Sequence, residues 1–324
     1  MGEPANKRQK TSPENECSSF TFQFGDDAEC PASYLHQFYP ESDLGEKNLQ
    51  TRVRVDPKTL LMLFTTASNA EVEDFKRSLG PVLKKFPQEE DYKNALNSSG
   101  RLLANAAPIK NSTLRLYKCA PSDATQLTNR MEALLLFFID GASIIDLSDP
   151  KWLLYYLVDE DDRILGFCSA YPFLLFPDKK RLRISQFFIV PPHQRRGLGS
   201  VLYRAIMQDA IADEDVKEVT VEDPSDEFCM FKLANDLAMV EAGEPVKVTT
   251  LQAELIELAN LYRSHHINNE DGEEFVTFRK RVKKYLCKKY PDCIPSEKDK
   301  KIAVLEDLFQ EEMSKINKVI RRGS

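Results

Sequence analysis

The sequence lacks several features that would each point to a particular class of protein. Its seven cysteines form no CxxC pair and its four histidines complete no zinc-like spacing, so neither a disulfide framework nor a structural metal is expected. Its longest apolar runs, such as LLLFFI, are far too short to span a membrane. No apolar segment follows the charged start MGEPANKRQK, so no secretory signal is predicted. We therefore expect a reducing, intracellular compartment and no metal.

An excess of basic charge is missing as well. The 324 residues carry a net charge of -7 and the pI is about 5.4, which argues against binding nucleic acid through bulk charge. An acidic surface is compatible with cationic partners. The polar residues 1–18 are expected to be disordered, and within them the basic run KRQK is either a nuclear-import signal or an ordinary charged tail.

The rest of the chain divides into three predicted domains. Residues 19–120 combine alternating runs such as SFTFQF with apolar runs, which indicates an N-terminal α/β domain. Residues 121–245 indicate a helix over 124–140 that ends at Gly141, then a strand hairpin, a further strand, a helix, a strand and a helix. Residues 246–324 are charged and have the helical period, which predicts a small helical C-terminal domain.

The run QRRGLG lies between a predicted strand, RLRISQFFIV, and a predicted helix, SVLYRAIMQDAIA. The first amides of a helix lack partners within it, and the helix dipole makes that end positive. Gly197 and Gly199 allow a ligand to approach the backbone closely, so the run predicts a pyrophosphate site. Arg195 and Arg196 either add charge to the site or are only solvated. Taken alone, the run is equally consistent with an ordinary glycine-bearing turn.

Carboxylates follow the next predicted strand, KEVTVE. Its last residue, Glu222, lies where α/β proteins tend to bind ligands. A lysine amine has a pKa of about 10.4, and a carboxylate whose pKa is raised by a partly apolar site can accept its proton. Asp223 precedes Pro224 and is predicted to be the N-cap of the following helix and to add negative potential. Asp140, at the predicted end of an apolar helix, is either solvent-facing or part of the site.

Taken together, these motifs resemble a known family. QRRGLG matches Gln/Arg-x-x-Gly-x-Gly, the coenzyme A motif of GNAT-type N-acetyltransferases. With FFIDGASIIDLSDPKW and VTVEDPSDEF, residues 120–245 resemble the catalytic subunit of type B histone acetyltransferases. The resemblance implies a GNAT-type fold, an α/β fold with a mixed, mostly antiparallel sheet flanked by helices.

The resemblance also implies an activity and partners. Acetyl would pass directly from acetyl-CoA to lysine amines on the N-terminal tail of free, newly made histones, chiefly histone four. A WD40-repeat histone-binding chaperone is the implied partner, and the implied location is the nucleus and the cytoplasm. From the composition, no metal, no direct contact with nucleic acid and no membrane contact are expected.

The resemblance assigns residues to roles as well. The general base falls on Glu222 with Asp223 beside it, and a third carboxylate, normally glutamate, falls on Asp140, one methylene shorter. The implied coenzyme contacts are Phe187, Phe188, Ile189, Gln194, Arg195, Arg196, Gly197, Leu198, Gly199, Ser200, Ser225 and Phe228. The implied histone contacts are Tyr171, Pro172, Phe173 and, more loosely, the acidic segment 43–46. The strand that carries Phe187 is also expected to pair its backbone with the amides of the pantetheine arm.

Two other hypotheses remain open. The chain is an acetyltransferase for a small amine or for another protein, or it is a histone-binding scaffold that keeps the fold without turnover. The change at Asp140 motivates the scaffold, whereas the glycine run and Glu222 favour an enzyme.

Overall fold

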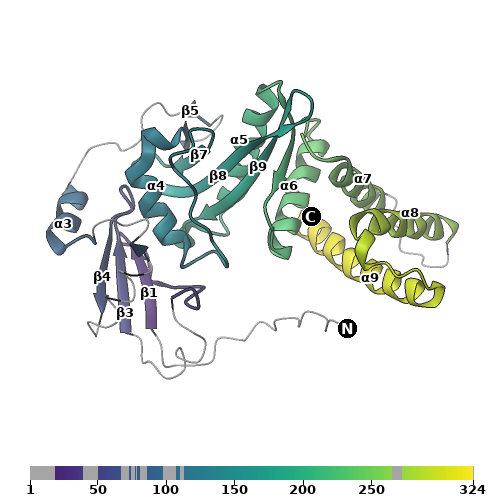
Figure 1. The fold of residues 1–324 in the computed structure, drawn as a ribbon, viewed down its shortest axis with the longest axis horizontal. Coiled ribbons are helices and arrows are strands. Elements are labelled where there is room, and N and C mark those ends of the chain that lie inside the picture. Colours follow the sequence, from purple (N-terminus) through teal and green to yellow (C-terminus); the bar gives the residue numbers. More distant parts are fainter. Residues whose placement is uncertain are drawn as a thin grey trace.

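The computed structural model describes most of the chain. The described residues are 19–38, 50–66, 73, 77, 79–80, 86–97, 107–109, 113–264 and 272–323. The tail 1–18 and the acidic segment 43–46 lie outside the described residues, so what the sequence predicts for them stays a prediction. Figure 1 shows a small N-terminal sheet, a larger central sheet and a group of C-terminal helices beside it.

The small sheet confirms the strand predicted from SFTFQF. Its strands are β1 (Ser19–Phe24), β2 (Cys30–Pro31), β3 (Gln50–Val55) and β4 (Met62–Thr66), in the order β2-β1-β3-β4. Phe20, Phe22 and Phe24 are buried because alternate side chains of β1 point to the same face. α3 (Glu89–Asn97) covers β4 and buries Tyr92 against Leu63.

The central sheet is mixed and mostly antiparallel, as predicted. Its strands are β5 (Ala107–Pro108), β6 (Arg115–Cys119), β7 (Leu153–Val158), β8 (Ile164–Leu175), β9 (Lys179–Ile189) and β10 (Val216–Val221). They lie in the order β10-β9-β8-β7-β6-β5, and only β9 and β10 run parallel. β5 and β6 precede residue 121 and nevertheless pair into this sheet.

Helices pack on both faces of the central sheet. α4 (Pro121–Leu135) lies between the two sheets (Figure 1), and its buried side chains share a core with those of β1 and β7. α5 (Leu198–Ala212) packs on the opposite face against β8, β9 and β10. The run of apolar residues in both helices therefore reflects burial.

The end of α4 differs from the prediction. The helix stops at Leu135 instead of continuing to residue 140, and Asp140 lies in the turn that follows. Residues 33–37 donate hydrogen bonds to the carbonyls that would otherwise accept from a further turn of helix. The amides of Ser33 and Tyr34 donate to Phe137 O, and the Gln37 side chain donates to Leu136 O and Ile139 O. These partners are about 100 residues away, so local periodicity does not reveal them.

The C-terminal region is helical, as predicted. α6 (Asp226–Glu241) joins the central sheet to α7 (Thr250–Ser264), α8 (Glu273–Lys289) and α9 (Lys298–Gly323), which share a core of their own. Short 3-10 turns lie at Pro191–His193 and Pro291–Cys293. Within the described part of the chain, every helix is too short or too polar to cross a membrane.

Candidate active site

The central feature of the site is a separation between β9 and β10. The two strands pair from Lys180 to Ile184, and the last bond of the pair runs from Glu222 N to Ile184 O at 2.8 Å. Beyond this point β9 pairs with β8 only, and a register shift leaves Ser185 as a bulged residue between the pairs Ser169–Gln186 and Ala170–Ile184. The edge of β9 that faces away from β8 is therefore open to a ligand over its last residues.

Glu222 lies at the mouth of this opening. It was predicted as the last residue of the strand, but β10 ends one residue earlier, at Val221, and Glu222 follows it directly. Its Oε2 accepts a 2.6 Å hydrogen bond from Ser185 Oγ. The carboxylate is exposed, which corrects the expectation of a partly apolar surrounding. An exposed carboxylate that accepts a hydrogen bond at one oxygen has its other oxygen left to accept a proton.

Asp223 does not cap the next helix, so that prediction is wrong. Asp223 has a φ of +36°, so the chain changes direction at this residue, and α6 begins three residues later, at Asp226. The N-cap is Ser225, whose hydroxyl accepts a 3.2 Å hydrogen bond from Phe228 N. Pro224 consequently precedes the cap instead of opening the helix, because the positive φ at Asp223 sets the direction of the chain.

The glycine run forms the predicted link between strand and helix. Gly197 has a φ of +80° and is the N-cap of α5, and Arg195 also has a positive φ, +60°. A Cβ at Gly199 would lie 3.3 Å from the Phe231 ring, so a side chain there would press on α6. Gln194 Nε2 donates to Ile189 O at 2.9 Å and holds the loop against the end of β9. Gln194 and both arginines are exposed.

Aromatic side chains line the opening between β9 and α6. The rings of Phe187, Phe228 and Phe231 lie 5.2 to 5.7 Å apart, and Tyr203 of α5 lies 5.9 Å from Phe231. Phe231 was not predicted from the sequence, although its i, i+3 spacing from Phe228 is a signal that both share one helix face.

Phe188 and Ile189 differ from Phe187. The side chain of Phe188 is buried on the α4 side, with its ring 5.6 Å from that of Phe138, so it can offer a ligand only its backbone. Ile189 is also buried. A cavity of about 370 Å³ is present here, and its lining includes Phe187, Ile189, Gln194, Ile139 and Ser33.

A buried polar network supports the bulge, and sequence reasoning missed it. Gln186 Nε2 donates to Glu132 Oε1 at 3.1 Å and to Ser143 O at 2.8 Å, and its Oε1 accepts from Ser169 Oγ. Glu132 Oε2 accepts from Ile145 N at 3.0 Å. Burial raises the pKa of the Glu132 carboxyl to about 7, and these hydrogen bonds oppose the rise. One glutamate within an apolar helical run was the available signal.

The predicted histone-contact residues lie on β8 next to the bulge. Tyr171 donates from its hydroxyl to Asp149 Oδ2 at 2.8 Å, and its ring lies 5.1 Å from Trp152 and 4.8 Å from Phe173. Pro172, between Tyr171 and Phe173 in the chain, is half-buried. Trp152, the last residue of DPKW, was not predicted to belong to the site. These aromatic side chains thus have Asp149 beside Tyr171 and the Arg183 guanidinium over the Phe173 ring, 4.5 Å from its centroid.

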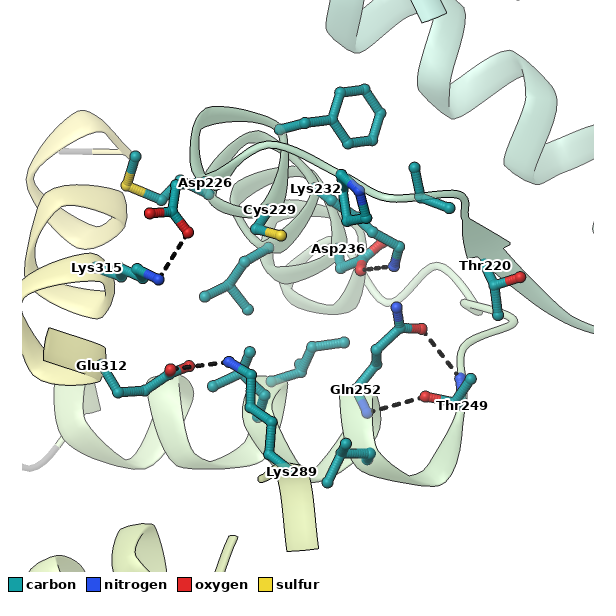
Figure 2. Close-up of a pocket in the computed structure, with 18 of the residues that line it drawn as sticks. Thr220, Asp226, Cys229, Lys232, Asp236, Thr249, Gln252, Lys289, Glu312 and Lys315 are labelled. Carbon is teal, nitrogen blue, oxygen red and sulfur yellow. Dashed lines mark hydrogen bonds and ion pairs between the residues drawn. The ribbon is translucent and has the colours of Figure 1, made fainter. Parts of the chain in front are cut away.

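Figure 2 shows a second cavity, with a volume of about 500 Å³. It is bounded by α6, the start of α7, α8 and α9, and its lining adjoins the site at the end of β10, at Pro224 and at Phe228. Its charged residues pair with one another, as Lys289 does with Glu312 and Lys315 with Asp226. Although larger, it lacks the glycine loop and Glu222, so the β9–β10 opening is the candidate active site. In the described ranges, no cluster of side chains suited to a metal ion is found.

Comparison with known proteins supports this choice. Residues 124–228 match the family model described as Acetyltransferase (GNAT) family, and they contain the opening, Glu222 and the glycine loop. This region is a GNAT-type domain, which confirms the predicted fold class.

Relatives of known name extend the match beyond this domain. A histone acetyltransferase type B catalytic subunit of Arabidopsis thaliana is 31% identical over 59% of this chain and 44% of its own length. Its counterpart in Schizosaccharomyces pombe is 39% identical over 50% of this chain and 44% of its own length. The matched region thus spans less than half the length of these relatives. The predicted resemblance to type B histone acetyltransferase catalytic subunits is confirmed over this matched region.

Proposed function

We propose that this chain, which carries a GNAT-type domain and resembles type B histone acetyltransferase catalytic subunits, transfers acetyl from acetyl-CoA to lysine amines of histone tails. The substrate would be the N-terminal tail of free, newly made histones, chiefly histone four. The observation that carries the proposal is the position of Glu222, held by Ser185 where β9 and β10 separate.

Acetyl-CoA fits the groups present at this opening. The free edge of β9 offers backbone donors and acceptors to the amides of a pantetheine arm. The first turn of α5, with Gly197 at positive φ and Gly199 against Phe231, offers amides and close approach to a pyrophosphate. Exposed Arg195 and Arg196 add positive charge at the same loop. Ser225 and Phe228 lie at the start of α6, across the opening from Phe187.

The chemistry requires a proton acceptor and a bound thioester. Glu222 removes a proton from the substrate ammonium, directly or through water, because only the neutral amine is a nucleophile. The amine nitrogen then forms a bond to the acetyl carbon, the carbon–sulfur bond breaks, and coenzyme A leaves with its sulfur taking up a proton. Direct transfer needs no covalent acyl-enzyme.

The surroundings of the site favour a cationic substrate. Glu222, Asp223 and Asp140 are exposed, and Asp149 accepts a hydrogen bond from Tyr171, whose ring lies beside that of Trp152. Acidic and aromatic groups together suit a basic peptide. A WD40-repeat histone-binding chaperone as partner, and a place in the nucleus and the cytoplasm, are parts of the same proposal that rest on the resemblance alone.

The direct test is product analysis. The purified chain is incubated with acetyl-CoA and, separately, a histone-four tail peptide, unrelated basic peptides and polyamines, and the products are read by mass spectrometry. The proposal expects acetyl-lysine on the histone peptide at a higher rate than on the others. Faster transfer to polyamines or unrelated peptides favours another acetyltransferase, and peptide binding without product indicates a scaffold.

A further inference from the structure

In the turn after α4, Asp140 lies beside a histidine that is far away in the sequence. His36 Nε2 lies 3.0 Å from Asp140 Oδ1. We propose that His36 is a positioning residue for Asp140, which keeps one carboxylate oxygen engaged so that the other is presented to the cationic side chain of the substrate. The inference rests on the proposed function, since that cation is the lysine ammonium.

The segment that carries His36 is held in place independently of the pair. Ser33 N and Tyr34 N donate to Phe137 O at 2.9 and 3.0 Å, and Gln37 Nε2 donates to two carbonyls of the same turn at 2.9 Å. The ring of Tyr34 meets that of His36 edge-on at 5.9 Å. The backbone on either side of His36 is therefore held by contacts that do not involve Asp140, and the Tyr34 ring packs against one side of the imidazole.

Asp140 is held less firmly than His36. It lies in a turn closed by the bond from Ala142 N to Ile139 O, with Gly141 at a φ of +66°. Its side chain is 53% exposed, and Oδ2 has no hydrogen-bond or ionic partner among the residues that the structure describes. An exposed aspartate in a turn loses side-chain entropy when it adopts one orientation, and a fixed imidazole lowers that cost.

The residue that precedes Asp140 reaches the cavity at the candidate site. Ile139, the residue before Asp140, lines the 370 Å³ cavity together with Phe187 and Gln194. On its other side the turn is tied to β9 through the bond from Gln186 Nε2 to Ser143 O. The free oxygen of Asp140 is thus on a short, anchored turn beside the opening, where an anionic acceptor favours an ammonium group.

The pairing also accounts for the residue type. The resemblance places glutamate at this position, and aspartate is one methylene shorter. A shorter side chain reaches less far, so fewer positions of its carboxylate can meet a substrate, and holding it in one of them matters more. His36 supplies that hold from the N-terminal segment.

The test compares His36→Ala, His36→Gln, Asp140→Ala and the double alanine variant in the full chain. The dissociation constant of a fluorescent histone-four tail peptide is measured with coenzyme A present, and kcat/KM is measured alongside. His36→Ala and Asp140→Ala should each weaken peptide binding about 3- to 10-fold. The double variant should be no weaker than Asp140→Ala alone, because the two residues act as one unit.

Three controls separate positioning from a general loss of structure. His36→Gln retains a neutral N–H donor near the place of imidazole Nε2, so it should bind nearly as wild type does. Gln37→Ala loosens the same segment without removing the imidazole and should lower the melting temperature more than the peptide affinity. A peptide with all lysines acetylated should bind all variants equally, as should acetyl-CoA.

The results decide the inference without depending on turnover. Independent, multiplicative effects of the two alanine substitutions, or equal losses for acetyl-CoA and for the acetylated peptide, would overturn it. If wild type binds the peptide but yields no acetyl-lysine, the proposed function fails while the affinity ratios still decide the role of His36. If wild type does not bind the peptide, both fail.

Discussion

Ser185 Oγ and Glu222 Oε2 lie 2.6 Å apart across the point where β9 and β10 separate. The hydroxyl belongs to the bulged residue of β9, and the carboxylate follows the last residue of β10. Since the hydroxyl is the donor, it orients the carboxylate and leaves its second oxygen to accept a proton.

Glu222→Gln should remove most of the activity while leaving the fold intact. An amide of the same shape still accepts from Ser185 through its oxygen but does not take a proton from the substrate. We expect kcat to fall by about 10²- to 10⁴-fold, with acetyl-CoA affinity nearly unchanged. Near-wild-type rates across the pH range would exclude Glu222 as the base.

Ser185→Ala should have a smaller effect of the same kind. It removes one hydrogen bond to the carboxylate, so we expect kcat to fall about 10-fold. Ser185→Thr keeps the hydroxyl and serves as the matched control. Steady-state kinetics on the tail peptide would distinguish the two variants, and equal rates for both would argue against a role for this bond.

The two glycines of the binding loop should respond differently to alanine. At Gly197 nothing lies within 4 Å of an added Cβ, but φ is +80°, so Gly197→Ala should cost about 1–2 kcal/mol in stability through backbone strain. At Gly199 the added Cβ meets Phe231 at 3.3 Å, so Gly199→Ala should displace the aromatic layer and raise the KM for acetyl-CoA. Denaturant unfolding and coenzyme kinetics on both variants would test this contrast; identical profiles would refute it.

The stability of the protein should carry a pH dependence from Glu132. Burial raises the pKa of this carboxyl from 4.5 to about 7 in the folded state. The charged form is thus disfavoured by folding, so the contribution of Glu132 to stability is greatest below pH 4.5 and is lost as pH rises through 7, by up to about 3 kcal/mol. Glu132→Gln removes this titration.

Denaturant unfolding at several pH values would measure the effect. The free energy of unfolding of wild type minus that of Glu132→Gln should decrease between pH 4.5 and 7 and then level off. A difference that stays constant over this range would show that Glu132 does not titrate as expected.

Local sequence was sufficient for most of the elements. The alternation in SFTFQF and KEVTVE predicted β1 and β10, and the charged helical period predicted the C-terminal helices. Such patterns arise because each element must bury one face, so they are visible in short windows. The position of Glu222 after a strand followed from the same pattern.

Three features were out of reach of local sequence. The end of α4 depends on donors from residues 33–37, the N-cap of α6 depends on the positive φ at Asp223, and the Glu132–Gln186 network joins a helix to a strand. Each involves a hydrogen bond or a dihedral that periodicity does not encode. Asp140 was placed at a helix end for this reason, whereas it lies in a turn.

The sequence by itself determined the elements, the glycine loop and the carboxylate beside it, because spacing and residue type decide which face is buried and where the chain turns. Only the tertiary structure decided that Ser185 holds Glu222, that Phe231 closes on Gly199 and that His36 meets Asp140. Each of these pairs joins residues more than 30 positions apart. Their contacts exist because the strands diverge and the N-terminal segment folds back on α4, and packing of the whole chain sets both.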